Sequence, residues 1–120
     1  MSDLLAALLH RQLTDLRAIT EQRKLLCERY KRGLNVLESK GALSTCRLTS
    51  EGNGHIFYIM LKDRQTTDSL RRYLGGLGIL ACTHYVPLHT SDYYKRNFPA
   101  VSLPNAEAFW RASLKIAVIL

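Results

Sequence analysis

Long hydrophobic runs are missing from this chain of 120 residues. Uncharged apolar runs such as Leu4–Leu9 and Ile116–Leu120 are far short of the roughly 20 residues that a membrane-spanning helix needs. The first residues, MSDLLAALLHRQL, have no basic segment before Leu4–Leu9 and carry Asp3 there. This pattern is typical of a helix start and not of a secretory signal peptide, so we predict no membrane partner.

Cysteine is also scarce. The chain has three cysteines, Cys27, Cys46 and Cys82, at wide spacings and without a CxxC pair. An odd number at such spacings does not indicate a disulfide framework or a paired zinc motif. We therefore predict a reduced, cytoplasmic setting in which the cysteines are small apolar residues of the core.

Acidic residues are few relative to basic ones: 10 Asp and Glu against 17 Lys and Arg, which gives a formal net charge of +7. Such an excess indicates a nucleic-acid partner, affinity for phosphorylated small molecules, or a solvated basic surface. The basic residues form no single block, and no zinc-finger, helix-turn-helix or RNP pattern accompanies them. We predict no specific nucleic-acid binding. A small basic module that binds nucleic acid or a protein remains the alternative from another functional class.

Leucines dominate the first third of the chain. Ser2 and Asp3 are candidate helix caps, and Gly41 is a candidate stop. Between them, apolar residues recur at helical spacings, which predicts one long amphipathic helix over residues 3–39. That helix would be about 55 Å long at 1.5 Å per residue, too long for a core of this size. We therefore expect the helix to need a packing surface that the other residues of this chain do not provide. The recurring apolar residues are Leu5, Leu8, Leu9, Leu13, Leu16, Ile19, Leu26, Tyr30, Leu34 and Leu37.

The remainder alternates strand and helix signals. A helix capped by Thr67 is expected to bury Leu70, Tyr73, Leu74 and Leu77, and Pro104 suits the first turn of another helix. We predict an α+β fold, with a small, mostly antiparallel sheet and helices on one face. Residues 1–40 would form a long connecting helix and residues 41–120 a small C-terminal domain. The expected strands are 44–50, 55–61, 79–84 and 114–120, with a turn at 51–54, a loop at 62–66 and a turn or short helix at 92–98.

Polar ring side chains surround a proline in the stretch HYVPLH, residues 84–89. Cys82, His84 and His89 are three candidate metal ligands, but a structural zinc site usually has four, in paired spacings. A nucleophilic dyad of a cysteine with His84 or His55 has no supporting motif. The glycine-rich turn EGNG precedes a strand, whereas a phosphate loop precedes a helix. From the residues alone, the HYVPLH stretch is either a binding loop or a locally packed one.

Three stretches together resemble the DegT–StrS family of sugar aminotransferases, and within it the branch that acts on nucleotide-linked 4-keto sugars. MSDLLAALLHRQL with EQRKLLCERYKRGL resembles the family's Met-Ser-(Asp/Glu)-x-x-Ala-Ala helix and its arginine-rich continuation. NGHIFYIML resembles its Asn-x-His-x-Phe-Tyr strand, and LRRYLGGLGILACTHYVPLHTSDYY its His-Tyr-x-Pro-Leu-His segment. The resemblance covers almost the whole chain up to Ser113.

The resemblance implies the connecting helix and small domain of a fold-type I, pyridoxal-phosphate enzyme. Such an enzyme is a dimer that moves an amino group from glutamate to a nucleotide-linked 4-keto-6-deoxy sugar in cell-surface polysaccharide synthesis. By the same resemblance, His84, Tyr85 and His89 match the loop that closes over the substrate, and Ser2 matches a segment near the cofactor. The long helix would pack on the large domain.

No lysine of this chain matches the family's cofactor-lysine motif. The resemblance therefore implies no catalytic, cofactor-binding or metal-binding residue here, and no bound cofactor for this chain alone. Lys115 stands where the family's Ser-Leu-Pro motif has proline, and the family continues with a further strand and helix. We expect a fragment or gene remnant, truncated at its end and inactive alone.

Overall fold

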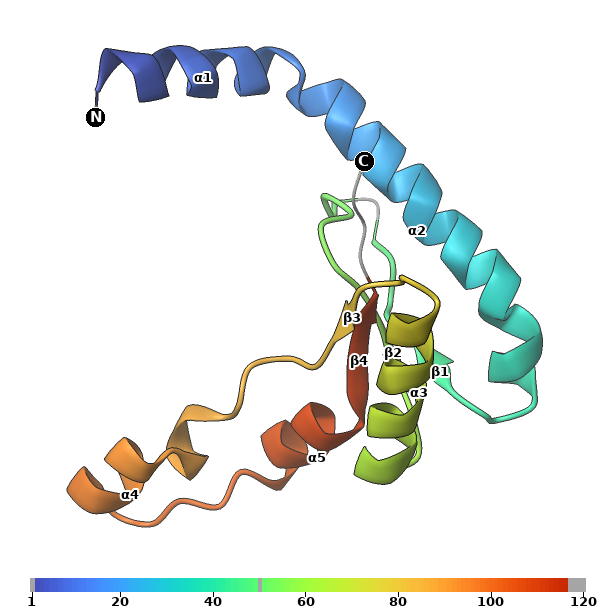
Figure 1. The fold of residues 1–120 in the computed structure, drawn as a ribbon, viewed down its shortest axis with the longest axis vertical. Helices are drawn as coiled ribbons and strands as arrows, with labels where there is room; N and C mark the ends of the chain where they lie inside the picture. The colour runs from blue at the N-terminus through green and yellow to red at the C-terminus, as the bar shows by residue number, and fades with distance from the viewer. Residues whose placement is uncertain (1, 50, 117–120) are drawn as a thin grey trace.

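The computed structural model describes residues 2–49 and 51–116, which form an antiparallel sheet with helices packed against it (Figure 1). The strand order is β1-β2-β4-β3, and every neighbouring pair is antiparallel. The predicted α+β class is therefore confirmed. The elements in chain order are α1 (Asp3–Thr14), α2 (Leu16–Ser39), β1 (Ser44–Thr45), β2 (Phe57–Met60), α3 (Arg64–Gly76), β3 (Ala81–Cys82), the 3₁₀ turn η1 (Leu88–Thr90), α4 (Asp92–Asn97), α5 (Pro104–Ala112) and β4 (Ser113–Ile116).

The core lies on the face of the sheet that carries Phe57, Ile59 and Leu114, all of them buried. Ile59 pairs with Leu114 across β2 and β4, so their side chains share this face. Residues of α2 and α3 cover it, and the Tyr30 ring centroid lies 5.3 Å from that of Phe57. Because alternate residues of β2 point to opposite faces, Tyr58 lies on the other side. There it packs against Phe109 of α5.

The N-terminal helical region is broken at Asp15, so the prediction of one continuous helix over 3–39 was wrong in that respect. Thr14 and Asp15 are poor helix formers, and the Thr14 hydroxyl donates to the His10 carbonyl at 3.0 Å. That bond competes with the helical backbone bonds and bends the chain. The predicted stop at Gly41 is confirmed, because Gly41 has φ +68°. The N–H groups of Gly41 and Ala42 donate to the carbonyls of Glu38 and Leu37, closing the helix end.

Helix α3 begins three residues before the predicted cap. Asp63 is the cap, and its carboxylate accepts the Thr66 N–H at 2.8 Å. Thr67 is instead fully buried, and its hydroxyl donates to the Asp63 and Ala112 carbonyls. Leu70 and Leu74 pack against the core as predicted. The other two residues expected to be buried, Tyr73 and Leu77, are exposed because the sheet is too small to cover them.

The strands are shorter than the predicted ranges. Strand β1 covers two residues of 44–50, β2 four of 55–61 and β3 two of 79–84. Backbone pairing ends earlier than the apolar pattern because β1 and β3 are edge strands with one neighbour each. The start of α5 at Pro104 and the helix at 92–97 are confirmed. Residues 117–120 of the predicted last strand lie outside the described residues. None of the helices in the described part of the chain is long and apolar enough to cross a membrane.

Replacing Asp63 with Ala should lower the thermal unfolding midpoint by about 5 °C, because the Thr66 N–H loses its acceptor at the start of α3. Asp63→Asn keeps an acceptor oxygen and its unfolding midpoint should stay close to that of the parent.

The Thr66 hydrogen bond holds the pKa of Asp63 below its usual range. The Asp63 contribution is therefore present above the carboxyl's unfolded-state pKa and lost as the pH falls through the folded-state value. Melting curves of the three proteins across this acid range check both statements. A parent-like midpoint for Asp63→Ala at neutral pH would contradict the first.

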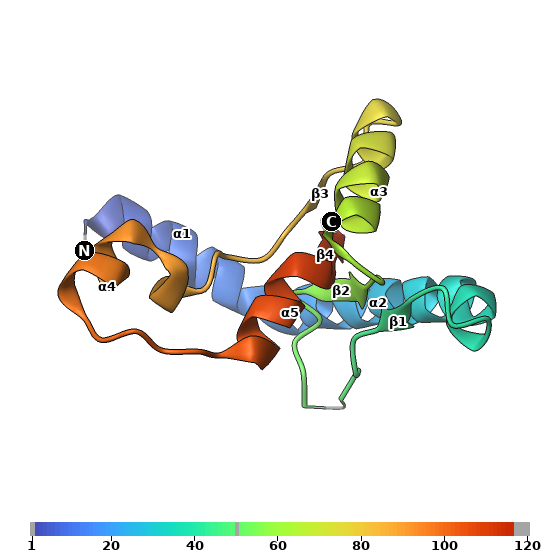
Figure 2. The same cartoon turned by 90° about the horizontal axis from the view of Figure 1, so that it is seen from below.

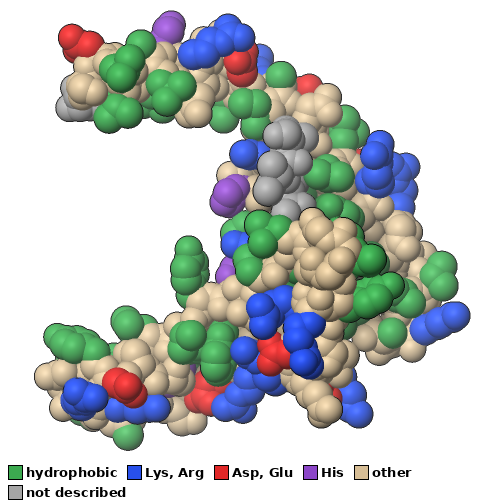
Figure 3. Space-filling model, in the orientation of Figure 1, with side chains coloured by type: hydrophobic (Ala, Val, Ile, Leu, Met, Phe, Trp, Pro, Cys, Tyr) green, Lys and Arg blue, Asp and Glu red, His purple; other side chains and the backbone are tan. Residues whose placement is uncertain are grey.

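The chain is open rather than compact. Its Cα radius of gyration is 17.8 Å, whereas a compact domain of this length has about 14 Å. Its accessible surface is 9264 Å², against about 6,600 Å² for a folded monomer of this mass. Helix α1 and the segment of η1 and α4 project to the same side of the sheet (Figures 1 and 2). The space-filling view shows an opening between these two arms, with hydrophobic side chains on both (Figure 3).

Candidate functional site

The HYVPLH stretch follows β3 and runs into η1, where hydrogen bonds close a turn after Pro87. The Pro87 carbonyl accepts both the N–H and the hydroxyl of Thr90, at 2.9 and 2.8 Å. The Ser91 hydroxyl donates to the Leu88 carbonyl at 2.7 Å. Proline restricts φ, and these bonds close the turn that follows it. The turn from Pro87 to Ser91 therefore presents His89 from a hydrogen-bonded backbone.

The three predicted site residues lie in different surroundings. The His84 ring packs against Phe109 and Tyr58, with ring centroids 5.3 and 6.2 Å away. Tyr85 is 91% exposed. The His89 side chain is only 7% exposed, and its Nε2 lies 3.3 Å from Oε1 of Glu107 on α5. These rings do not converge on one point.

The alternatives based on metal and thiol chemistry find no support among the residues that the structure describes. No cluster of three or more His, Cys, Asp or Glu residues with metal-binding geometry exists there, so Cys82, His84 and His89 do not form such a site. The three cysteines are free thiols. Burial, and secondarily Cys46, raises the pKa of Cys27, which disfavours the nucleophilic thiolate near neutral pH.

A cavity of about 720 Å³ lies beside the loop. One wall is formed by His89 and Thr90, another by Tyr94 and Lys95 of α4, and a third by α5. Helix α5 contributes Glu107, Trp110 and Arg111. The guanidinium of Arg111 lies 2.9 Å from Oε2 of Glu107, so this pair neutralises itself. The cavity thus offers hydroxyl, ammonium and ring groups next to the predicted binding loop.

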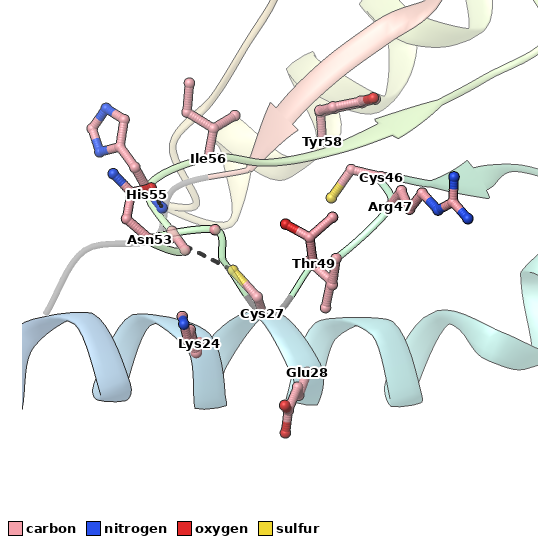
Figure 4. A pocket seen from close by; sticks show the side chains of 13 residues that line it. Lys24, Cys27, Glu28, Cys46, Arg47, Thr49, Asn53, His55, Ile56 and Tyr58 are labelled. Atoms are coloured by element: carbon pink, nitrogen blue, oxygen red, sulfur yellow. Dashed lines mark hydrogen bonds between the residues drawn. The ribbon is translucent and has the colours of Figure 1, made fainter.

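Sequence reasoning missed a second cavity, of about 570 Å³, between α2 and the turn that joins β1 to β2 (Figure 4). The Cys27 thiol donates to the Gly54 carbonyl at 3.6 Å on its floor. Glycine is required at position 54, because φ is +64° and an added Cβ would lie 2.9 Å from the α2 backbone. The side chain of Glu28 points away from the cavity (Figure 4). The EGNG turn was the signal in the sequence, and its role is close packing on α2.

Comparison with known proteins finds aminotransferases, both among family models and among solved structures. The model of the DegT/DnrJ/EryC1/StrS aminotransferase family matches residues 1–119. Among solved structures, DesV from S. venezuelae, determined in complex with a ketimine intermediate, is 31% identical, with a TM-score of 0.79 over 92% of this chain and 29% of that one. A provisionally named sugar aminotransferase from Streptococcus pneumoniae, solved in its PLP form, is 22% identical, with a TM-score of 0.83 over 97% of this chain and 30% of that one.

A third similar structure is PseC from Helicobacter pylori, an aminotransferase of pseudaminic acid biosynthesis. It is 21% identical, with a TM-score of 0.78 over 88% of this chain and 29% of that one. At this identity the likeness to PseC and to the pneumococcal protein shows the fold alone. The chain spans less than a third of the length of each of these structures.

Proposed function

This chain belongs to the DegT/DnrJ/EryC1/StrS aminotransferase family, and from that premise we propose that it is the C-terminal part of a pyridoxal-phosphate-dependent sugar aminotransferase. The reaction is transfer of the amino group of glutamate to a nucleotide-linked 4-keto-6-deoxy sugar, for cell-surface polysaccharide synthesis. The order of the three motifs along the chain supports this choice. The motifs resemble those of dTDP-4-amino-4,6-dideoxygalactose transaminase, and we propose that the enzyme makes this amino sugar.

The proposed division of the chain is a connecting helical region, residues 1–40, and a small domain, residues 41–120. The exposed leucines of α1 support a packing role for the first region, because no described residue of the chain buries them. The partner surface would be the large domain of the same enzyme or a second subunit, and we propose a homodimer. The free cysteines support a reducing, cytoplasmic location.

The substrate-side residues in this proposal are His84, Tyr85 and His89. The Tyr85 hydroxyl is open to solvent, so it is available to the hydroxyl groups or diphosphate of a nucleotide sugar. His89 lines the cavity beside the loop and Glu107 engages its Nε2, so Nδ1 is the ring nitrogen that we propose for contact with a ligand. The hydrogen-bonded turn after Pro87 supports such a role for His89, since a pre-ordered turn loses little entropy on binding.

We propose that the described residues do not form a pyridoxal phosphate site by themselves. That cofactor needs a lysine, an acid beside the pyridine nitrogen, and N–H donors for its phosphate. Lys24 lines one cavity, but the neighbouring carboxylate, Glu28, points away from it (Figure 4). Lys95 lines the other, where Glu107 is already engaged by His89 and Arg111. We propose that the cofactor is held by the part of the enzyme that this chain does not match.

The 120-residue polypeptide should therefore give no transamination with glutamate, pyridoxal phosphate and a dTDP-4-keto-6-deoxy sugar. Chromatography of the sugar nucleotides checks for product, and an absorption spectrum checks for a specific Schiff base. The comparison is a longer product, expressed from the same DNA with its upstream sequence included, which should convert the substrate. Turnover by the 120 residues alone would overturn the proposal that the cofactor is held outside this chain. A longer product that carries a cofactor lysine and uses no nucleotide sugar would overturn the proposed function.

A further inference from the structure

Glu107 stands in the first turn of α5 and has a different partner for each carboxylate oxygen. Oε1 lies 3.3 Å from Nε2 of His89, and Oε2 lies 2.9 Å from the guanidinium of Arg111 one turn further along α5. The first contact joins residues 18 positions apart. It therefore links the HYVPLH stretch to a helix that continues directly into β4 of the sheet.

The burial of the two partners shows which of them needs this contact. The His89 side chain is 7% exposed, whereas that of Arg111 is 58% exposed. A buried ring nitrogen without a hydrogen-bond partner is costly, while an exposed guanidinium is well solvated by water. The contact with Arg111 therefore orients the Glu107 carboxylate, and the contact with His89 depends on that orientation.

The charged and titratable groups around His89 come from two elements. Helix α5 contributes Glu107 and Arg111, and α4 contributes Lys95 and Tyr94 to the same cavity. Among the described residues that line this cavity, Glu107 is the sole carboxylate. No other acid there is in place to accept a hydrogen bond from the ring.

We propose that Glu107 is a positioning residue for the substrate loop, acting through His89. Its carboxylate accepts the Nε2–H of His89, which holds the neutral ring in the tautomer that carries the proton on Nε2. Nδ1 then has a lone pair and presents a hydrogen-bond acceptor to a ligand hydroxyl. The same contact joins η1 to α5. The role of this geometry in substrate binding rests on the proposed function, but the geometry itself does not.

Nitrogen NMR of the 120-residue chain labelled with ¹⁵N-histidine tests the proposal directly. In the parent, recorded at a pH at which the ring is neutral, the His89 ring should be in the single tautomer protonated on Nε2, assigned by the loss of its signals in His89→Gln. Glu107→Met removes the acceptor, so the ring should become a mixture of tautomers. The backbone amides of Thr90 and Ser91 should then exchange about tenfold faster. Glu107→Gln keeps a carbonyl oxygen at the same place and should restore the single tautomer.

The matched control is Glu28→Met, the same substitution on an exposed position of α2, which should leave the ring signals unchanged. The backbone amides of β2 and β4 show whether Glu107→Met folds. If it does not, Arg111→Met is the second test. In that variant the Glu107 carboxylate loses its orientation, so the mixture of tautomers should appear. A parent-like tautomer in either folded variant would overturn the proposal, and so would an equal effect of Glu28→Met. Since no substrate is present, these results are independent of any failure of the transamination assay.

Discussion

Replacing Phe57 with Ala is expected to remove about 3–5 kcal/mol of stability, the largest loss of any single substitution proposed for this chain. Phe57 is fully buried in the middle of the sheet, and its ring packs against Tyr30 of α2. Phe-to-Ala substitutions at such sites cost about 3–5 kcal/mol, because apolar contact is lost and a cavity remains. Small domains are stable by only about 5–15 kcal/mol, and this one has a small core for its length. The substitution should therefore remove a large part of the available stability.

Urea titration followed by circular dichroism measures this loss. The matched control is Phe98→Ala, because Phe98 is a half-exposed ring that contacts Tyr93 and Tyr94 away from the sheet. That variant should lose less than about 1 kcal/mol, as is usual for partly exposed positions. Equal unfolding midpoints for the two variants would show that the sheet face around Phe57 is not the main source of stability.

The second large effect concerns self-association through α1. Leu5, Leu8 and Leu9 are each between 42% and 57% exposed on this helix. The whole chain exposes about 2,700 Å² more surface than a compact monomer of its mass, and a standard protein interface buries about 1,600 Å². Leucines exposed together on one helix form an apolar patch, and such a patch is expected to find a partner. We therefore expect the polypeptide to form dimers or larger species.

Changing Leu5, Leu8 and Leu9 together to Gln should shift the chain to a monomer in sedimentation velocity and light scattering. The helix should persist, because Gln has nearly the helix propensity of Leu. Leu80→Gln, at an exposed position before β3, provides the control and should associate like the parent. A parent that stays monomeric at high concentration and binds no hydrophobic dye would contradict the prediction.

Much of the candidate site could not be predicted from the sequence, although its loop could. The HYVPLH stretch was recognised because two histidines, a tyrosine and a proline within six residues are an unusual local pattern. Nothing local indicated that His89 would be buried against Glu107, because 18 residues separate them. The aromatic contact of His84 with Phe109 could not be predicted either, because these two residues are also far apart in the sequence. The cavity beside α2 depends on how closely the Gly54 backbone approaches that helix.

By itself, the sequence determined the α+β class, the helix stop at Gly41, the start of α5 at Pro104 and the place of the central strand. These features follow from short-range causes: φ limits of glycine and proline, cap chemistry, and the period of apolar residues. The break at Asp15 has a local cause that the apolar period does not show, whereas the tertiary structure alone decided the burial of Thr67 and the separate surroundings of His84, Tyr85 and His89. The last two depend on which groups distant segments bring within hydrogen-bond reach. Thr67, for example, is a good helix cap in isolation, but its buried hydroxyl donates to the Ala112 carbonyl, 45 residues away.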